Sequence, residues 1–321
     1  MIIDIHSHYL PRDVVSADGP VQLTESSDHV LITANEHRYR APVELLDPES
    51  QFRTDYGDSL RGRTLLLPPF ALLYELDIDA GTAWSRRLNK SVAAAAARDP
   101  RRLFGFGTVP LQAGGDAAAA ELDHAVNTLG LRGVEILTTV AGRSLVDSDI
   151  DAFWAAAERL RVPVFIHPHY VAAAEQLSAF HLRNVIGNPV ETGTAAVQLM
   201  LSPVLTRYPS LTIILAHGGG ILPGIFGRLV HAASVRPEYA GHDPAAIKSL
   251  LRRFWYDTVV FDPRTLSHLS SLVGPDRVLA GTDFPFDMAE RQPLLLVDDA
   301  DVSASERQSI LQGAQRLLPE S

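Results

Sequence analysis

Eight short apolar segments, rich in β-branched residues, recur along the 321-residue chain. They are apolar almost throughout, which is typical of parallel strands covered by helices on both faces. The segments are Ile2–His6, Thr64–Leu67, Leu103–Val109, Gly133–Leu137, Val162–His167, Leu211–His217, Trp255–Val260 and Val278–Thr282. Helical patterns lie between several of them, at Ser85–Arg98, Asp116–Leu129, Ile150–Leu160 and Thr192–Tyr208.

This alternation predicts the architecture. Eight strand–helix units over about 250 residues is the size of a (β/α)8, or TIM, barrel. A doubly wound open sheet is the competing architecture, but no Gly-x-Gly-x-x-Gly turn follows the first strand. We therefore predict an α/β fold of the TIM-barrel type, with residues 1–321 forming a single domain.

The connection after the first strand, residues 9–63, is much longer than a usual βα loop. It contains three strand-like segments, Val21–Ser26, His29–Thr33 and His37–Ala41. We expect a small β insertion that lies over the barrel mouth. Near the other end of the chain, Ser303–Leu318 has the pattern of a closing helix.

Composition excludes several classes of protein. The formal net charge is −10 at pH 7, and there is no long basic run, which argues against a nucleic-acid or anionic membrane surface. No apolar stretch is long enough for a transmembrane helix. Because the chain has no cysteine, it has no disulfide and no thiolate ligand. We expect a cytoplasmic protein.

Polar side chains stand at the ends of four predicted strands. His6 and His8 are two residues apart, so on a strand they point the same way. His167, His217 and Asp283 end or directly follow the fifth, sixth and eighth strands. Barrel enzymes place their chemistry at this end of the strands. Each residue alone could be structural, but together they predict a metal site, whose histidine and carboxylate donors suit Zn²⁺ better than Mn²⁺ or Fe²⁺.

Four motifs add a family resemblance. They are Asp4–His8, His167–Pro168, the His-Gly-Gly-Gly run in Ala216–Gly220, and the Gly-Thr-Asp-Phe-Pro-Phe run Gly281–Phe286. These motifs resemble those of the amidohydrolase superfamily, and most of all the branch of 2-amino-3-carboxymuconate-6-semialdehyde decarboxylase and related aromatic-acid decarboxylases. The resemblance extends from the first strand to the closing helix.

The resemblance implies roles for the strand-end residues. One metal ion per chain would be held by His6, His8, His167 and Asp283. The catalytic residues would be Asp283 and His217, and His217 would act as the acid/base. Binuclear relatives usually add a Lys or Glu at the tip of the fourth strand. Glu135 lies before that tip. We therefore prefer a single metal and interpret Glu135 as a structural carboxylate or a support for a ligand.

Substrate binding by this family uses arginine, because its planar fork matches a carboxylate. By resemblance, Arg40 in the β insertion would bind the substrate's carboxylate, as would Arg228 on a helix after the glycine-rich run. Arg228 would act from the partner subunit of a homodimer. His169 stands where the decarboxylase has Trp, and we interpret it as pocket surface rather than an outer ligand. Phe286 is a further candidate contact for the substrate.

We therefore expect metal-dependent, nonoxidative decarboxylation of an unsaturated or aromatic carboxylic acid, a small molecule. The same residues could instead serve a hydrolase or hydratase acting on a lactone, an amide or an enol. A noncatalytic ligand-binding barrel is an alternative of another class. All five polar strand-end positions are filled, which favours an enzyme.

Overall fold

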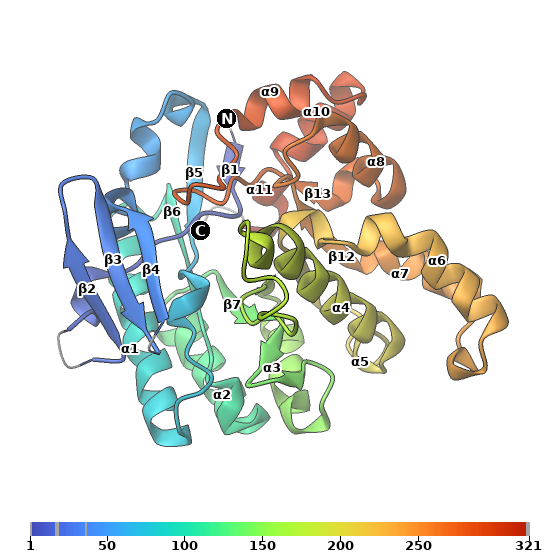
Figure 1. Cartoon of the computed structure of the whole chain (residues 1–321), viewed down its shortest axis with the longest axis horizontal. Coiled ribbons are helices and arrows are strands. Elements are labelled where there is room, and N and C mark those ends of the chain that lie inside the picture. Colours follow the sequence, from blue (N-terminus) through green and yellow to red (C-terminus); the bar gives the residue numbers. More distant parts are fainter. Residues whose placement is uncertain (1, 17–18, 36, 319–321) are drawn as a thin grey trace.

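A computed structural model of the chain describes residues 2–16, 19–35 and 37–318. Eight strands form one parallel sheet (Figure 1). In order across the sheet they are β1 (Ile2–Asp4), β5 (Leu60–Leu65), β6 (Leu103–Gly107), β7 (Gly133–Leu137), β10 (Pro163–His167), β11 (Thr212–Leu215), β12 (Phe254–Asp257) and β13 (Val278–Leu279).

Backbone hydrogen bonds bring the two edges of this sheet together. The Ile5 N–H donates to the Ala280 carbonyl oxygen at 2.9 Å, and the Asp283 N–H donates to the His6 carbonyl oxygen at 2.7 Å. The sheet thus curves into the predicted (β/α)8 barrel, which confirms the fold class.

Helices surround the strands. They are α1 (Ile78–Ala96), α2 (Gly115–Asp123), α3 (Asp151–Leu160), α4 (Asn188–Leu201), α5 (Val204–Arg207), α6 (Leu222–Val235), α7 (Pro244–Leu250), α8 (Pro263–Val273), α9 (Pro293–Asp298), α10 (Ala304–Leu311) and α11 (Ala314–Leu317). Single π-helical turns, His124–Thr128 and Arg183–Gly187, adjoin α2 and α4. Within the described ranges, no helix has both the length and the apolar character needed to span a membrane. The cytoplasmic location stays a prediction.

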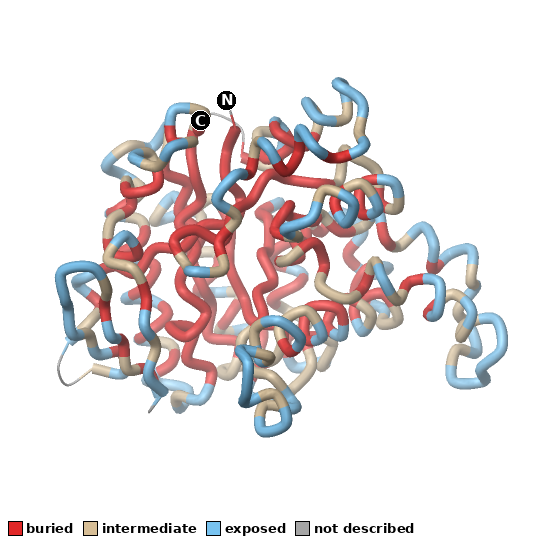
Figure 2. The backbone as a smooth tube through the Cα atoms, turned by 45° about the horizontal axis from the view of Figure 1, so that its top comes forward, coloured by how far each residue is buried: buried red, intermediate tan, exposed pale blue. Residues whose placement is uncertain are grey.

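The barrel interior is filled by branched and aromatic side chains. They are Ile3, Ile5, Leu66, Phe104, Phe106, Phe165, Ile214 and Leu279, with the smaller Ala216 among them. Figure 2 shows the strands as a buried centre and the surrounding loops as the exposed rim. Because burial of each such side chain contributes about 1.5–3 kcal/mol, the strands form a rigid base for the polar residues at their ends.

The start of the second barrel strand differs from the prediction, and a buried polar residue explains the difference. β5 begins at Leu60 rather than Thr64, so the insertion ends earlier than residue 63. Arg63 breaks the apolar pattern in the sequence, yet it is fully buried. Its guanidinium donates to the Ser7 hydroxyl at 2.9 Å and to the His8 carbonyl at 2.7 Å. Arg63 thus stabilises the residues that follow the first strand. Because it interrupts the apolar pattern, the start of the second barrel strand could not be predicted from the sequence.

Two predicted helices are divided. α4 begins at Asn188 rather than at residue 192, and Pro203 separates it from α5. The closing segment forms α10 and α11 instead of one helix. The chain turns at Gly313, where a Cβ atom would lie 2.7 Å from the Leu279 side chain and 3.0 Å from the Val278 carbonyl oxygen. Only glycine allows this approach to β13.

The predicted strands of the insertion form an antiparallel sheet, drawn at the left of Figure 1: β2 (Val21–Glu25), β3 (His29–Ala34) and β4 (His37–Pro42). Tyr39 stacks on Phe70 with ring centroids 4.5 Å apart, and its hydroxyl lies 3.4 Å from His169 Nε2. Because side chains alternate along a strand, Arg40 points to the opposite face. That the insertion covers the barrel mouth, and that the whole chain is one domain, stay predictions.

Candidate metal centre

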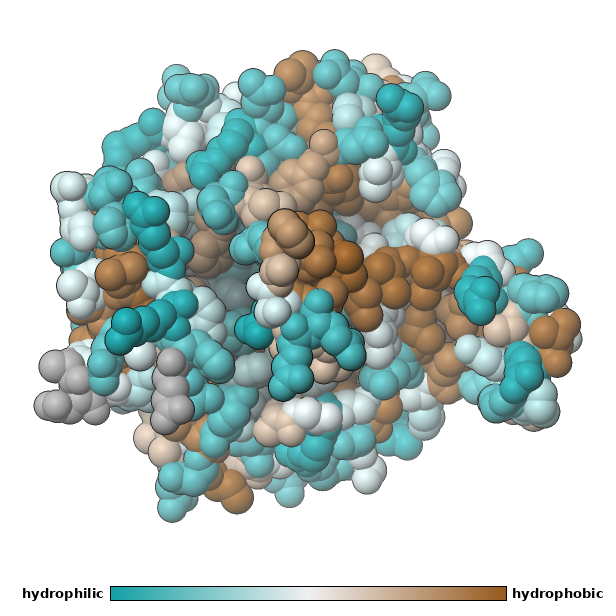
Figure 3. Space-filling model, viewed as in Figure 1, coloured by the Kyte–Doolittle hydropathy of each residue, from teal (hydrophilic) through white to brown (hydrophobic). Residues whose placement is uncertain are grey.

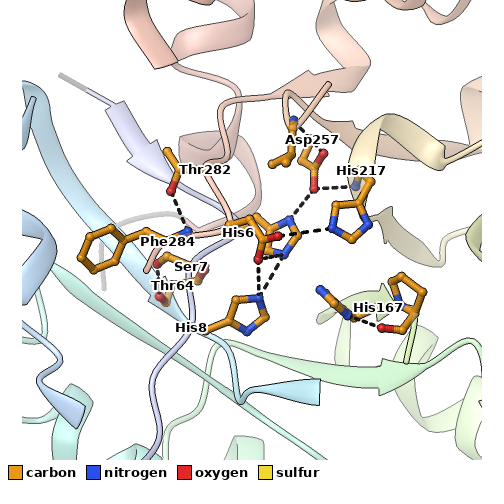
Figure 4. A network of polar contacts seen from close by, with 12 residues as sticks. His6, Ser7, His8, Thr64, His167, His217, Asp257, Thr282 and Phe284 are labelled. Carbon is orange, nitrogen blue, oxygen red and sulfur yellow. Dashed lines mark hydrogen bonds and ion pairs between the residues drawn. The ribbon is translucent and has the colours of Figure 1, made fainter. Parts of the chain in front are cut away.

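Four of the predicted site residues come together at the C-terminal end of the barrel. β1 ends at Asp4, whose carboxylate accepts the His6 backbone N–H at 2.9 Å, and the chain then turns inward. One possible ligand atom from each residue lies within 4.8 Å of the others in a buried group, hereafter the four-ligand group: His6, His8, His167 and Asp283. Figure 4 shows the histidine rings arranged around one space, with His217 beside them.

The outer ring nitrogen of each histidine in this group faces an oxygen. The acceptors are the Asp257 carboxylate for His6 Nδ1 (2.6 Å), the Leu67 carbonyl for His8 Nδ1 (2.8 Å) and the Pro168 carbonyl for His167 Nδ1 (2.7 Å). Since a carbonyl or carboxylate oxygen can only accept, Nδ1 carries the proton and Nε2 of a neutral ring keeps a lone pair. All three lone pairs are therefore directed to the inside of the group.

This arrangement fits a cation. Nε2 of His6 and Nε2 of His8 lie 3.1 Å apart, and Asp283 Oδ1 is 3.4 Å and 3.0 Å from them. His167 Nε2 and Asp283 Oδ1 are buried without a hydrogen-bond partner. When the rings are neutral, lone pairs and a carboxylate at these distances repel one another unless a positive charge lies between them. Three imidazole nitrogens and one carboxylate oxygen form a donor set suited to a divalent transition metal.

The pKa shifts describe the charge of the group. Burial alone would lower the pKa of His6, but the carboxylates of Asp283 and Asp257 raise it to about 9. Burial lowers the pKa of His8 and holds that of His167 well below its ordinary value. Burial would raise the pKa of Asp283, but the neighbouring imidazoles hold it well below its ordinary value. At neutral pH Asp283 is therefore ionised and the rings of His8 and His167 are neutral, whereas the His6 ring carries an additional proton that a bound metal would displace.

Asp257 is a functional residue that the sequence analysis missed. It lies at the end of β12, fully buried, and holds two parts of the site at once. Besides the His6 ring, it accepts the backbone N–H groups of His217 at 3.0 Å and Gly218 at 2.8 Å. Asp257 lies within the predicted strand Trp255–Val260. A carboxylate inside an apolar segment was the feature of the sequence that could have identified it.

His217 lies between the four-ligand group and a cleft. Its Nε2 is 3.5 Å from Asp283 Oδ2, and its Nδ1 is buried without a hydrogen-bond partner. The cleft has a volume of about 250 Å³, and His217 and Asp283 both line it. The left-handed backbone at His217 (φ 55°) and the following glycines set this position. A Cβ atom on Gly220 would lie only 2.1 Å from the Pro189 carbonyl oxygen.

Glu135 is near the group but is not one of its four members. It is fully buried on β7, and neither carboxylate oxygen has a hydrogen-bond partner. Burial raises its pKa well above the ordinary value. Its predicted role as a structural or supporting carboxyl stays a prediction.

Of the residues predicted to bind substrate, Phe286 contacts the four-ligand group, whereas the two arginines do not. Phe286 contacts His8, with ring centroids 5.0 Å apart, and His169 Nε2 lies 3.4 Å from the Tyr39 hydroxyl of the insertion. Burial lowers the pKa of His169 to about 4, so its ring is neutral. Arg40 is 67% exposed and lies 3.9 Å from Asp28, and Arg228 is exposed in the middle of α6. The structure does not bring either arginine to the four-ligand group of its own chain.

Known proteins resemble this chain in family, sequence and fold. A family model described as amidohydrolase matches residues 3–319. The chain is 27% identical, over 97% of its length and 89% of the relative's, to 2-amino-3-carboxymuconate-6-semialdehyde decarboxylase of Dictyostelium discoideum. It is 31% identical to 6-methylsalicylic acid decarboxylase of Penicillium expansum, over 66% of each chain.

A solved structure of similar fold is the dihydroxybenzoic acid decarboxylase from Polaromonas sp. JS666, with bound manganese and the inhibitor 2-nitroresorcinol. The TM-score is 0.80 at 22% identity, with all of this chain and 98% of that chain covered. The likeness confirms the barrel fold.

The bond from His6 to Asp257 generates a prediction. Asp257→Asn should lower metal affinity by about 10–100-fold, because an amide orients the His6 ring less strongly than a carboxylate does. Competition with a chelator measures the affinity, and thermal unfolding checks that the fold persists. Asp262→Asn, an exposed helix cap on α8, is the matched control. Equal metal affinities in the two variants would show that Asp257 does not support the metal ligand.

Proposed function

The chain belongs to the amidohydrolase family, and on that premise we propose that it is a metal-dependent, nonoxidative decarboxylase of an unsaturated or aromatic carboxylic acid. The observation that carries this proposal is the place of His217, between the four-ligand group and the cleft. Relatives across the family that are named as decarboxylases of carboxymuconate and aromatic acids support it.

The alternatives use the same ligands. A hydrolase or hydratase needs water directed at a lactone, an amide or an enol, whereas a decarboxylase needs a proton donor beside an apolar ring. Val259, Val260, Phe261 and Met288 give the cleft an apolar wall that suits a ring. A noncatalytic ligand-binding barrel would have no need of His217, a partly buried proton carrier beside the ligands.

The residues of the chain would act as follows. A bound divalent metal would supply positive charge for the substrate and lower the pKa of a water in the site. His217 would deliver a proton to the carbon that bears the carboxylate. The bond from that carbon to the carboxylate then breaks, carbon dioxide leaves, and the electron pair of the bond restores the conjugated system. The apolar wall would hold the ring in place for this transfer.

The metal is predicted to be one ion per chain, with Zn²⁺ favoured over Mn²⁺ or Fe²⁺ by its three imidazole donors. Elemental analysis of untagged protein should give a stoichiometry near one. Glu135→Gln should give the same value, because Glu135 lies outside the four-ligand group. A stoichiometry near two that falls to one in Glu135→Gln would replace this proposal by a binuclear site.

The role of His217 predicts a separation of metal binding from turnover. His217→Ala should keep most of the metal but release carbon dioxide roughly 10²–10⁴-fold more slowly, as expected for a lost proton donor. The assay is carbon dioxide release from a panel of aromatic and muconate acids, with metal content measured in parallel. If His217→Ala lost its metal while His167→Ala kept it, the two roles would have to be exchanged.

A homodimer is part of the proposal. Exposed apolar residues lie near the cleft, on the turn before α4, on α4 and after β12: Val185, Ile186, Val190 and Phe261. Figure 3 shows hydrophobic surface over this region. Such a patch is typical of a protein interface. Gly224 and Gly227 leave open space on α6 beside the exposed Arg228, which would allow a close approach by a second copy.

The dimer predicts complementation between two inactive variants. In a heterodimer of Arg228→Ala with His217→Ala, one site keeps its own His217 and receives an intact Arg228 from its neighbour. The Arg228→Ala homodimer should be inactive because loss of the arginine costs about 2–5 kcal/mol in substrate binding. Part of the activity should return after subunit exchange with His217→Ala. His8→Ala mixed with His217→Ala is the control, since both changes disable their own site. No recovery in heterodimers verified by mass spectrometry would remove Arg228 from the neighbour's site.

A further inference from the structure

A second cleft is formed by the insertion, mainly by segment 42–54 after β4, and by segment 284–291 after β13. Its volume is about 480 Å³, within the range of roughly 300–1,000 Å³ usual for small-molecule sites. Within the described residues, it shares no lining residue with the cleft beside His217, and none of its lining residues belongs to the four-ligand group. It is hereafter called the arginine cleft.

Arginine supplies the positive charge of this cleft. Its charged lining residues are Arg12, Arg53, Arg291, Glu44 and Asp47, which carry a net charge of +1 when all are ionised. Arg12 pairs with Glu25, which lies outside the lining, and Arg53 pairs with Asp47. The side chains of Arg12 and Arg53 are 56% and 62% exposed. Such exposed ion pairs contribute little stability, so both arginines can turn to another anion at low cost.

The chemistry of the wall indicates the kind of molecule that the arginine cleft would bind. Two prolines, Val43 and Phe284 give it an apolar surface beside the arginines. A guanidinium has five N–H groups in a planar fork that matches a carboxylate, and one existing carboxylate contact leaves others available. Three guanidiniums beside an apolar wall therefore suit a small organic acid with two carboxylates on an apolar body.

Phe284 connects the arginine cleft to the metal centre. It directly follows Asp283, and its carbonyl oxygen accepts the His8 backbone N–H at 2.7 Å. The buried guanidinium of Arg63 lies 5.3 Å from the centre of the Phe284 ring and donates to the His8 carbonyl at 2.7 Å. Both backbone polar groups of one metal ligand are thus held by Phe284 and by the arginine that packs on it.

Arg291 gives a second connection. Its guanidinium donates to the Phe286 carbonyl at 2.9 Å, and the Phe286 ring packs on His8. Arg53 lies on the opposite side of the chain's insertion boundary, in the segment after β4. A molecule that binds Arg53 and Arg291 together would therefore join the insertion to the loop that follows β13.

We propose that the arginine cleft is an effector site for a small dicarboxylic acid, and that the bound acid raises the affinity of the metal centre for its ion. The acid would hold the insertion against the loop after β13, so that less conformational freedom is lost when the ligands close on a metal. Linkage requires the metal to raise the affinity for the acid by the same factor. The proposal goes beyond the reaction at the metal centre and does not depend on it.

Equilibrium binding to the metal-loaded protein tests the ligand class. The probes are adipate and 1,3-benzenedicarboxylate, with their neutral diamides as counterparts. At least one dicarboxylate should bind about tenfold more tightly than its diamide, as expected for a charge-assisted hydrogen bond. Added salt should reduce this preference, because exposed charges are screened. Diamides that bind as tightly as both dicarboxylates would overturn the proposal.

Variants locate the binding. Arg12→Gln and Arg53→Gln should each weaken the dicarboxylate by about tenfold. Asp47→Asn should tighten it, because it removes the carboxylate that competes for Arg53, and a gain of affinity cannot come from misfolding. Arg159→Gln is the matched control, since it removes an exposed arginine from its pair with Asp123. If Arg53→Gln bound the dicarboxylate as tightly as Arg159→Gln, the acid would lie elsewhere and the proposal would fail.

Metal affinity tests the effect of the bound acid. Chelator competition at buffered free metal should show at least fivefold tighter metal binding with saturating dicarboxylate, the lower end of usual coupling between two sites. The diamide should have no effect, and Arg53→Gln should need about tenfold more acid for the same effect. An unchanged metal affinity, or an equal dose requirement in Arg53→Gln, would overturn the proposal. Since neither measurement uses turnover, a failure of the decarboxylase assignment would leave both results standing.

Discussion

The site depends on one electrostatic constraint: a carboxylate and the inward-facing nitrogens of three imidazoles are held within 4.8 Å of one another in a buried group. Such a group is unfavourable unless a cation is shared by all its members. Its geometry must therefore be imposed by the surrounding fold. The three Nδ1–H groups are fixed by Asp257 and by two backbone carbonyls, which turns each Nε2 inward. Ring orientation is thus decided by the barrel rather than by the ligands themselves.

The fold imposes this geometry through a second buried network around Asp4. Its carboxylate accepts the Thr282 backbone N–H at 3.1 Å, the Thr282 hydroxyl at 2.5 Å and the Gln51 amide at 2.5 Å. It also accepts the His6 backbone N–H. One side chain thereby joins the exit of the first strand to the insertion and to the loop that carries Asp283. Because these residues lie far apart in the chain, the ligands from its two ends take their places only when the barrel closes.

The sequence predicted the features that depend on local pattern and on the tendency of barrel enzymes to place functional residues at the C-terminal ends of the strands. Eight apolar segments gave the strands, and polar residues at their ends gave His6, His8, His167 and Asp283. It did not predict what depends on tertiary contact. Arg63 sits in a strand because Ser7 and the His8 carbonyl satisfy it, and no local pattern shows that. Arg40 had the right residue type, but the direction of its side chain is set by the register of β4 against β3.

In the proposed mechanism, Asp257 would link metal binding to proton transfer. It holds the ring of His6 and the backbone of His217, so a shift of this carboxylate would move a metal ligand and the acid/base together. Both roles are therefore set by β1, β10, β11, β12 and the loop after β13, which share the rigid interior. Much of the surface of the cleft comes instead from the turn before α4, where Asn184 lies, and from the segment after β12, where Val260 and Phe261 lie. Since these segments carry none of the four metal ligands, they can change the substrate while the chemistry stays in place. The specificity of this chain should accordingly be sought in its cleft and not in its metal ligands.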